Sequence, residues 1–213
     1  MLYADSDTGK RIEPSPGLTA FCPWCKTEMT PACGYVNIWH WKHVTKQNCN
    51  YKEETAWHRG WKRLSEKQGC KVEKIIGNGD HIADVVVRDP KQFKGSIIEL
   101  QHSSITAEEA VKRCHFYLRN RYKTTWLFDL TDKYERGHIE FKKIEGRNDP
   151  MILNQKWQKR ILFSLVSESG EPKFGRLYVD VGMEKIFMIK KVHKNGNGWG
   201  FFKDKKYIFS KNL

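Results

Sequence analysis

The sequence lacks any apolar run that approaches the roughly 18 residues of a membrane-spanning helix. Its first residues, MLYADSDTGKR, also lack the apolar stretch of a secretory signal peptide. We therefore expect a cytoplasmic protein without a membrane partner, in a compartment that keeps thiols reduced. The six cysteines then indicate metal ligands or core residues rather than disulfides. Internal repeats and low-complexity tracts are also missing, which argues against repeat architectures.

Acidic residues are scarce relative to basic ones. The chain of 213 residues has 25 Asp and Glu against 38 Lys and Arg, a net charge of +13, and its isoelectric point is about 9.4. This excess is more than solubility needs and is typical of proteins that bind a polyanion. We expect nucleic acid, and DNA in particular, as the partner; a solvated lysine surface without a partner is the alternative. The sequence indicates no small-molecule cofactor.

Pattern divides the chain into a module at 1–50, a core at 51–130 and a C-terminal extension at 131–213, to which the pattern assigns no role. The module is short, aromatic and irregular, which suits turns and short strands. The core is predicted to form, in chain order, a helix over Glu53–Lys67, strands over Val72–Ile76, His81–Arg88 and Ser96–Gln101, a helix capped by Thr106, and a strand over Thr124–Leu130. This order predicts an α/β fold of the mixed α+β kind, with helices packed on a mixed sheet.

Two of these predicted strands carry acid where a core residue is expected. The string HIADVVV contains Asp84, and SIIELQ contains Glu99 and Gln101. Because side chains alternate along a strand, Glu99 and Gln101 point to the same face. A buried charge is costly unless it is paired or bound to a metal. Asp84 and Glu99 therefore predict a divalent cation between neighbouring strands, and oxygen ligands favour Mg²⁺ or Mn²⁺.

The helix that precedes these acids has a polar face. Glu54, His58 and Lys62 are spaced four apart and therefore lie one turn above another. Glu54 is a candidate for the metal shell, His58 for positioning a phosphate or a water, and Lys62 for holding a phosphate. A solvated polar helix face is the alternative explanation of the same spacing.

The N-terminal module has the spacing of a structural zinc site, since CPWC supplies Cys22 and Cys25, and WHWKH with the next cysteine supplies His40, His43 and Cys49. Structural zinc takes four ligands, often two close cysteines and two later Cys or His residues. We expect Cys22, Cys25 and His40 as ligands. The fourth is either His43 or Cys49. A thiol-redox pair at CPWC is the alternative, but such a motif should open a helix after a strand.

Together these strings resemble the competence-protein CoiA-like family, which is placed in the PD-(D/E)XK nuclease superfamily. The resemblance covers about residues 1–130. It is carried by CPWC and WHWKH, by ETAWHRGWK, by HIADVVV and IIELQHSSI, and by a helix with Arg113 and Tyr117. It implies a core of a helix, three strands, a helix and a strand, which is the order predicted above.

The resemblance also implies roles for the strand residues. Asp84 is similar to the first acid of the superfamily site, and Glu99 and Gln101 resemble its D/E-X-K element, with glutamine in place of lysine. Glutamine is neutral, so it can form hydrogen bonds but cannot supply a positive charge. The missing charge is expected to come from Lys62 or Arg113.

The helices before and after the strands match the family as well. Glu54 resembles the acid of the first helix, and His58 and Lys62 fall on later positions of that helix. Arg113 and Tyr117 match the helix that follows the site, where the resemblance implies contact with the substrate.

These observations predict a Mg²⁺- or Mn²⁺-dependent nuclease that hydrolyses DNA, with structural zinc in its N-terminal module. Asp84 and Glu99 are the expected ligands of the catalytic metal. The alternative is a zinc-bearing nucleic-acid-binding adaptor whose nuclease core no longer cuts. The presence of Asp84, Glu99 and Glu54 together favours the enzyme, because a degraded site has no reason to keep three acids.

Overall fold

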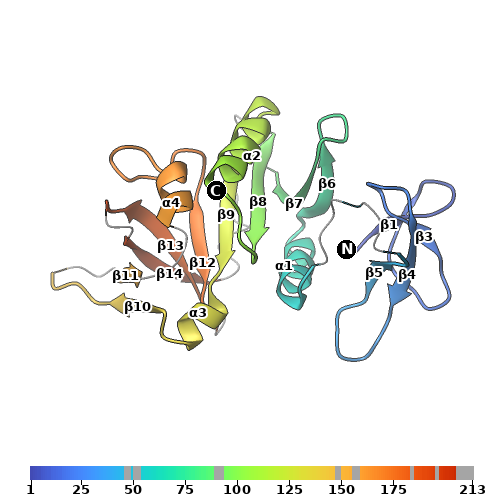
Figure 1. The fold of residues 1–213 in the computed structure, drawn as a ribbon, viewed down its shortest axis with the longest axis horizontal. Coiled ribbons are helices and arrows are strands. Elements are labelled where there is room, and N and C mark those ends of the chain that lie inside the picture. Colours follow the sequence, from blue (N-terminus) through green and yellow to red (C-terminus); the bar gives the residue numbers. More distant parts are fainter. Residues whose placement is uncertain are drawn as a thin grey trace.

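The computed structural model describes residues 1–45, 49, 54–88, 94–146, 150–154, 159–182, 185–194 and 197–204. Within these residues the chain forms two β-sheets and four α-helices, so the expected mixed α+β class is confirmed (Figure 1). The N-terminal residues form a small sheet at one end of the molecule, and the larger sheet with its helices makes up the rest. None of the described helices is long and apolar enough to cross a membrane.

The small sheet has five short strands in the order β2-β1-β3-β4-β5, and every neighbouring pair is antiparallel. The strands are β1 (Ala4–Asp5), β2 (Arg11–Ile12), β3 (Ala20–Phe21), β4 (Glu28–Ala32) and β5 (His40–His43). Its core is small, with Met29 and Trp41 packed against Cys22. A core of this size buries little apolar surface, so the module needs a further source of stability.

The large sheet has nine strands in the order β10-β11-β14-β13-β12-β9-β8-β7-β6. The strands are β6 (Lys71–Ile76), β7 (His81–Val87), β8 (Gly95–Gln101), β9 (Tyr122–Asp129), β10 (Ile139–Lys142), β11 (Met151–Asn154), β12 (Leu177–Asp180), β13 (Lys185–Val192) and β14 (Gly198–Asp204). Strands β8, β9 and β12 run parallel at the centre, and the other pairs are antiparallel. Because β12 pairs with β9, the residues expected to form a C-terminal extension continue the sheet of the core. The division at residues 50 and 130 stays a prediction.

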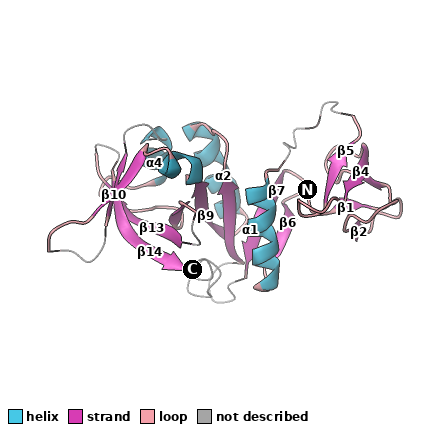
Figure 2. Ribbon diagram, turned by 90° about the horizontal axis from the view of Figure 1, so that it is seen from below, coloured by secondary structure: helices cyan, strands magenta, loops and turns pink. Residues whose placement is uncertain are grey.

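Helices cover both faces of the large sheet. They are α1 (Ala56–Lys67), α2 (Ala107–Arg119), α3 (Thr131–Glu135) and α4 (Lys159–Leu165). On β9, Trp126 and Phe128 pack on the side of α2 and α4, whereas Leu127 packs with Trp61 of α1 on the other side. This alternation is the period of two that buries a central strand on both faces. Figure 2 shows α2 and α4 on one side of the sheet and α1 on the other.

The predicted order of helix, three strands, helix and strand matches α1, β6 to β8, α2 and β9. Among the described residues α1 begins at Ala56; Glu53, its expected first residue, lies outside them. Thr106 caps α2 as expected, since its hydroxyl accepts a hydrogen bond from the backbone N–H of Glu109 at 3.1 Å. Thr55 caps α1 in the same way. The caps fix where both helices begin, and so they position the side chains of the following turns.

A buried aspartate ties α1 to the C-terminal half of the large sheet. Asp180, at the end of β12, accepts hydrogen bonds from the indole N–H groups of Trp57 and Trp61 at 3.0 and 2.8 Å. Its other oxygen accepts from the backbone N–H of Gly182 at 2.9 Å. The carboxylate thus satisfies three donors that have little access to water, and their loss of a partner would be costly.

We expect Asp180→Ala to lower the free energy of unfolding by about 2–4 kcal/mol, because it leaves two indole N–H groups and one backbone N–H without their acceptor. Urea unfolding followed by circular dichroism measures the change. Glu168→Ala is the control, because Glu168 is exposed. Equal stability of the two variants would contradict the role assigned to Asp180.

Candidate functional site

The two strand acids face each other at the point where the pairing of β7 and β8 ends. The regular ladder runs up to the pair Val85 and Ile98, and its register places Asp84 opposite Glu99. Beyond that pair, the backbone N–H of Leu100 donates to Oδ2 of Asp84 at 3.0 Å. The carboxylate of Asp84 therefore accepts the hydrogen bond that a backbone carbonyl of β7 would accept in a regular ladder. The fold thus brings Asp84 and Glu99 together.

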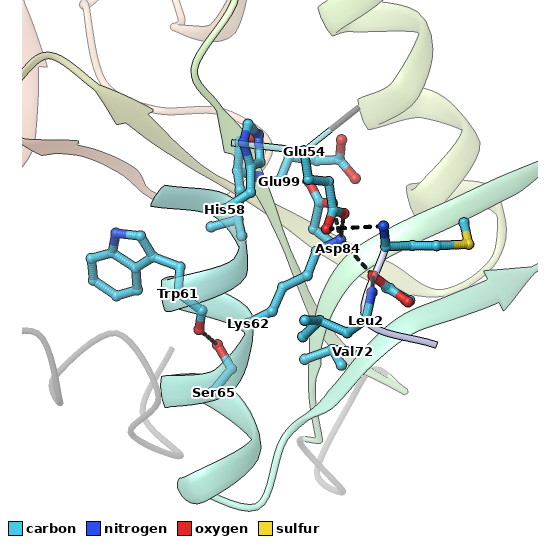
Figure 3. Close-up of polar contacts among 12 residues, drawn as sticks. Leu2, Glu54, His58, Trp61, Lys62, Ser65, Val72, Asp84 and Glu99 are labelled. Carbon is cyan, nitrogen blue, oxygen red and sulfur yellow. Dashed lines mark hydrogen bonds and ion pairs between the residues drawn. The ribbon is translucent and has the colours of Figure 1, made fainter. Parts of the chain in front are cut away.

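The ammonium group of Lys62 lies among three carboxylates (Figure 3). Lys62 projects from α1 and is only 1% exposed. Its Nζ pairs with Oδ1 of Asp84 at 3.2 Å, with Oε1 of Glu73 at 3.3 Å, and with Glu54. Burial alone would lower the pKa of Lys62, but the three carboxylates outweigh burial and raise this pKa above its usual value. In this arrangement the ammonium neutralises acids and does not face solvent, where a phosphate would approach.

Glu73 is a member of this cluster that the sequence prediction missed. It lies in β6, where the register with β7 places it opposite Asp84. Its backbone φ of 48° lies in the left-handed region, which residues other than glycine seldom adopt. Its buried carboxylate accepts hydrogen bonds from the backbone N–H groups of Leu2 and Tyr3 at 2.8 and 3.1 Å. In the string KVEKII, an acid between lysines has the pattern of a solvated strand, so the sequence held no signal of burial.

Glu99 has a cation and a hydroxyl donor of its own. Nη1 of Arg113 donates to Oε2 at 2.8 Å, and the hydroxyl of Tyr117 donates to Oε1 at 2.7 Å. Burial is the main factor that raises the pKa of Glu99, and the charge of Asp84 raises it further. Arg113 and Tyr117 offset part of this rise. The charge of Asp84 thus disfavours the charged form of Glu99, and a cation between the two acids would relieve the repulsion.

Solvent reaches the acids through Asp84. Its side chain is 23% exposed, whereas those of Glu54, Glu73 and Glu99 are 7% exposed or less. A water molecule or a cation that enters from solvent therefore meets Asp84 first. Groups of the helices and of the N-terminal module bind the other carboxylates and keep them from solvent.

His58 is held on the carbonyl group that follows Glu99 in the chain. Its Nε2 donates to the backbone oxygen of Leu100 at 2.9 Å, and its Nδ1 lies 2.9 Å from the hydroxyl of Thr55. A carbonyl oxygen only accepts, so this hydrogen bond requires a proton on Nε2 of His58. The buried amide of Gln101 donates to the backbone oxygen of Ser103.

The N-terminal module reaches the acid cluster through Glu73. The guanidinium of Arg11 donates to the backbone oxygens of Glu73 and Val72 at 3.1 and 2.8 Å. The hydroxyl of Tyr3 donates to Glu66 of α1. The module is therefore bonded both to β6 and to α1, which are the two elements that carry Glu73 and Lys62.

Three cysteines and one histidine of the module converge on one point. One ligand atom each from Cys22, Cys25, His43 and Cys49 lies within 4.8 Å of all the others. The sulfur atoms of Cys22 and Cys49 are 3.9 Å apart, and Sγ of Cys25 lies 3.3 Å from Nε2 of His43. Two thiolates bound at about 2.3 Å to a tetrahedral zinc lie roughly 3.8 Å apart. The donor set and its spacing therefore fit structural zinc.

The structure does not bring His40, an expected ligand, into this cluster, whereas His43 and Cys49 both belong to it. His40 and His43 are three residues apart on β5, so their side chains point to opposite faces of the strand. His43 shares its face with Trp41, which packs in the core of the module. Nδ1 of His40 instead lies 2.8 Å from the backbone oxygen of Ile38. Applying strand periodicity to WHWKH would have separated the two histidines.

The turn at CPWC leads into a strand and not into a helix. It connects β3 to β4, and the backbone N–H of Cys22 donates to the oxygen of Thr27 at 2.9 Å. The helix that a thiol-redox motif should open is therefore missing here. Burial raises the pKa of Cys25, but hydrogen bonds from Thr27, Cys49 and His43 outweigh it and lower this pKa to about 6. A thiol that ionises readily suits metal binding, because zinc takes the thiolate form.

A family model matches well over half of the chain. The model, described as competence protein CoiA, nuclease-like domain, matches residues 61–194. The matched residues include Lys62, Asp84 and Glu99, whereas Glu54 and His58 precede the match. No curated protein matches the chain, and no solved structure does.

Freshly purified, chelator-free protein should contain about one zinc per chain. Cys22→Ser and Cys49→Ser should each lose most of the zinc and melt at a lower temperature, because metal-binding free energy is folding free energy in such small modules. His40→Ala is the matched control and should keep its zinc. Elemental analysis with thermal melting measures both effects, and a Cys49 variant that keeps zinc while the His40 variant loses it would reverse the ligand assignment.

Lys62→Met should lower the free energy of unfolding by about 3–5 kcal/mol, because it keeps most of the side-chain volume but leaves buried carboxylates without their cation. Lys67→Met is the matched control, since Lys67 is exposed on the same helix. Adding Glu73→Gln to the Lys62 variant should recover part of the loss, because it removes one of the unpaired charges. Denaturant unfolding at neutral pH measures all three, and a Lys62 variant as stable as the control would refute this account of the cluster.

Proposed function

Because the chain belongs to the CoiA nuclease-like family, we propose that it is a metal-dependent nuclease that hydrolyses phosphodiester bonds of DNA on a PD-(D/E)XK-type core. The observation that carries the proposal is Asp84 opposite Glu99, with a buried lysine beside them. Phosphodiester hydrolysis needs a metal-binding acid pair and fixed positive charge, because negative charge on the phosphate must be neutralised as the bond breaks. The net charge of +13 supports a polyanionic substrate.

Asp84 and Glu99 would hold Mg²⁺ or Mn²⁺, with the backbone oxygen of Leu100 as a further ligand. All three are oxygen donors, which hard divalent cations prefer. Each carboxylate oxygen has two lone pairs, so the hydrogen bonds that the acids accept leave room for metal coordination. When bound, such an ion lowers the pKa of a water molecule and neutralises charge on the scissile phosphate. The raised pKa of Glu99, which comes partly from Asp84, supports a cation at this place.

Lys62 supplies a fixed positive charge beside Asp84 in place of the charge that Gln101 lacks, and its buried ammonium acts on that acid rather than on the phosphate directly. Its Nζ lies 3.2 Å from Asp84, although the side chain comes from α1 rather than from the strand that carries Glu99. The charge is fixed, because three carboxylates stabilise the ammonium form. Gln101 lies on the face of Glu99, and we assign its amide to orienting the attacking water by hydrogen bonds.

Arg113 and Tyr117 divide the role that the family resemblance implies for them. Tyr117 is 1% exposed and donates to Glu99, so we assign it to positioning that acid. The side chain of Arg113 is 31% exposed and also pairs with Glu99. Its outer edge is therefore available to a phosphate, and guanidinium groups suit phosphate oxygens.

Asp84→Asn and Glu99→Gln should each lower cleavage by about 10²-fold or more, the loss expected when a group that stabilises charge in the transition state is removed. Binding to DNA should survive, because each change removes a negative charge near phosphate. Labelled single-stranded and double-stranded DNA, and RNA of the same sequence, are incubated with Mn²⁺ or Mg²⁺ and resolved on denaturing gels. EDTA should abolish cleavage.

Asp80→Asn is the control, because Asp80 is an exposed acid in the turn just before β7. Parental cleavage rates in both site variants would refute the assigned site. Binding without cleavage under every metal condition would instead favour the second candidate, a nucleic-acid-binding adaptor with an inactive core. The neutral Gln101 at the lysine position is the observation that keeps this candidate open.

A further inference from the structure

A surface of aromatic and lysine side chains lies on β13 and β14, apart from the acid cluster. Trp199, Phe201 and Lys203 alternate along β14 and therefore share one face of the strand. Lys190 joins them from β13. We call these four residues the aromatic–lysine face. Each is half-buried, so its outer side meets solvent, and β14 lies beyond the residues that the family model matches.

The aromatic–lysine face lies on the α1 side of the large sheet. Phe201 pairs with Met188 across the ladder, and Met188 packs in the apolar cluster that contains Trp61 of α1. The helix itself packs mainly on β6 and β7 (Figure 2), and its Trp57 and Trp61 side chains reach as far as Asp180 of β12. Among the described residues, no helix lies on this side of β13 and β14. The described helices therefore leave this part of the sheet uncovered.

Positive charge lies directly against the aromatic rings. Nζ of Lys190 is 4.3 Å from the ring centre of Phe201 and 5.4 Å from that of Trp199. Nζ of Lys203 is 4.1 Å from the ring centre of Phe201. These distances are within the range of cation–π attraction. The strands beneath are packed closely, since a Cβ atom on Gly200 would lie 1.6 Å from the backbone oxygen of Met188.

We propose that the aromatic–lysine face binds single-stranded nucleic acid, and this proposal rests on the nuclease function proposed above. Stacking on Phe201 and Trp199 requires unpaired bases, because neighbouring bases cover each base face in a duplex. Long lysine side chains beside the rings reach the phosphates that link stacked bases. Aromatic rings with interleaved cations are the combination by which single-strand-binding surfaces hold their ligand. An acidic protein would form ion pairs with the lysines, but its binding would not require the aromatic rings.

Fluorescence anisotropy with a labelled oligodeoxythymidine of about 20 nucleotides, in EDTA, measures binding by the full chain without cleavage. Phe201→Ala should weaken binding about 10-fold or more, as expected for the loss of one stacked base. Phe201→Tyr keeps a ring and should bind as the parental protein does. Tyr35→Ala is the matched control, because Tyr35 is an exposed aromatic residue of the N-terminal module.

A second variant tests the lysines without touching the rings. Lys190→Gln combined with Lys203→Gln should weaken binding and reduce its salt dependence, because fewer phosphates are neutralised. Lys10→Gln with Lys71→Gln is the charge-matched control on exposed residues elsewhere. If circular dichroism shows that the Phe201→Ala protein is unfolded, the paired lysine variant decides the question, and parental affinity in that variant overturns the proposal.

Three further outcomes overturn the proposal. The first is parental affinity in a folded Phe201→Ala protein. The second is that Phe201→Ala weakens binding equally for a single strand and for a duplex of the same length. The third is a parental protein that is a dimer on gel filtration and becomes a monomer in Phe201→Ala, because the face would then bind a second copy of the chain. The nuclease proposal fails separately. Binding that depends on Phe201 in a protein that cuts nothing supports this surface and refutes the nuclease. Metal-dependent cleavage with parental binding by Phe201→Ala refutes the surface alone.

Discussion

The buried ammonium of Lys62 is the interaction on which the rest of the structure depends. It draws together Glu54 before α1, Glu73 on β6 and Asp84 on β7. Charges this far from water are tolerated only when each has partners, so the three elements cannot shift independently. Apolar packing beneath, with Trp61 of α1 in one cluster with the strands, supplies a non-directional attraction that would accept several registers. The ion cluster selects one of them, and so it determines where Asp84 stands relative to Glu99.

Local pattern predicted the central elements because each is periodic over its own length. Asp84 and Glu99 stood out because they interrupt strands that are otherwise apolar, and a period of four placed Lys62 on one face of its helix. The pattern did not reveal that β12 lies beside β9, because strand neighbours distant in sequence are a matter of topology rather than of local composition. The sequence did not predict Glu73 for the same reason, since its burial comes from the N-terminal module and not from its own strand.

Spacing along the chain identified the residue types of the proposed zinc site but not the full ligand set. A close Cys pair and a later Cys and His cluster limit the candidates, yet only the side-chain direction on β5 separates His43 from His40. The same limit applies to Asp180, whose three donors come from α1 and from the turn after β12. A polar residue at the end of an apolar strand gives no sign of which distant donors it will satisfy.

Glu73 lies in β6, but the N-terminal module binds its carboxylate, and this bears on whether the parts of the molecule can be separated. The family match begins at residue 61. However, Glu54 and His58 precede that point, and the backbone of Leu2 and Tyr3 secures the carboxylate of Glu73. A chain trimmed to the matched residues would keep both strand acids and lose the scaffold that aligns them. The unit that holds the proposed site is therefore wider than the matched residues, and a truncated fragment would not represent it when relatives are compared or domains are recombined.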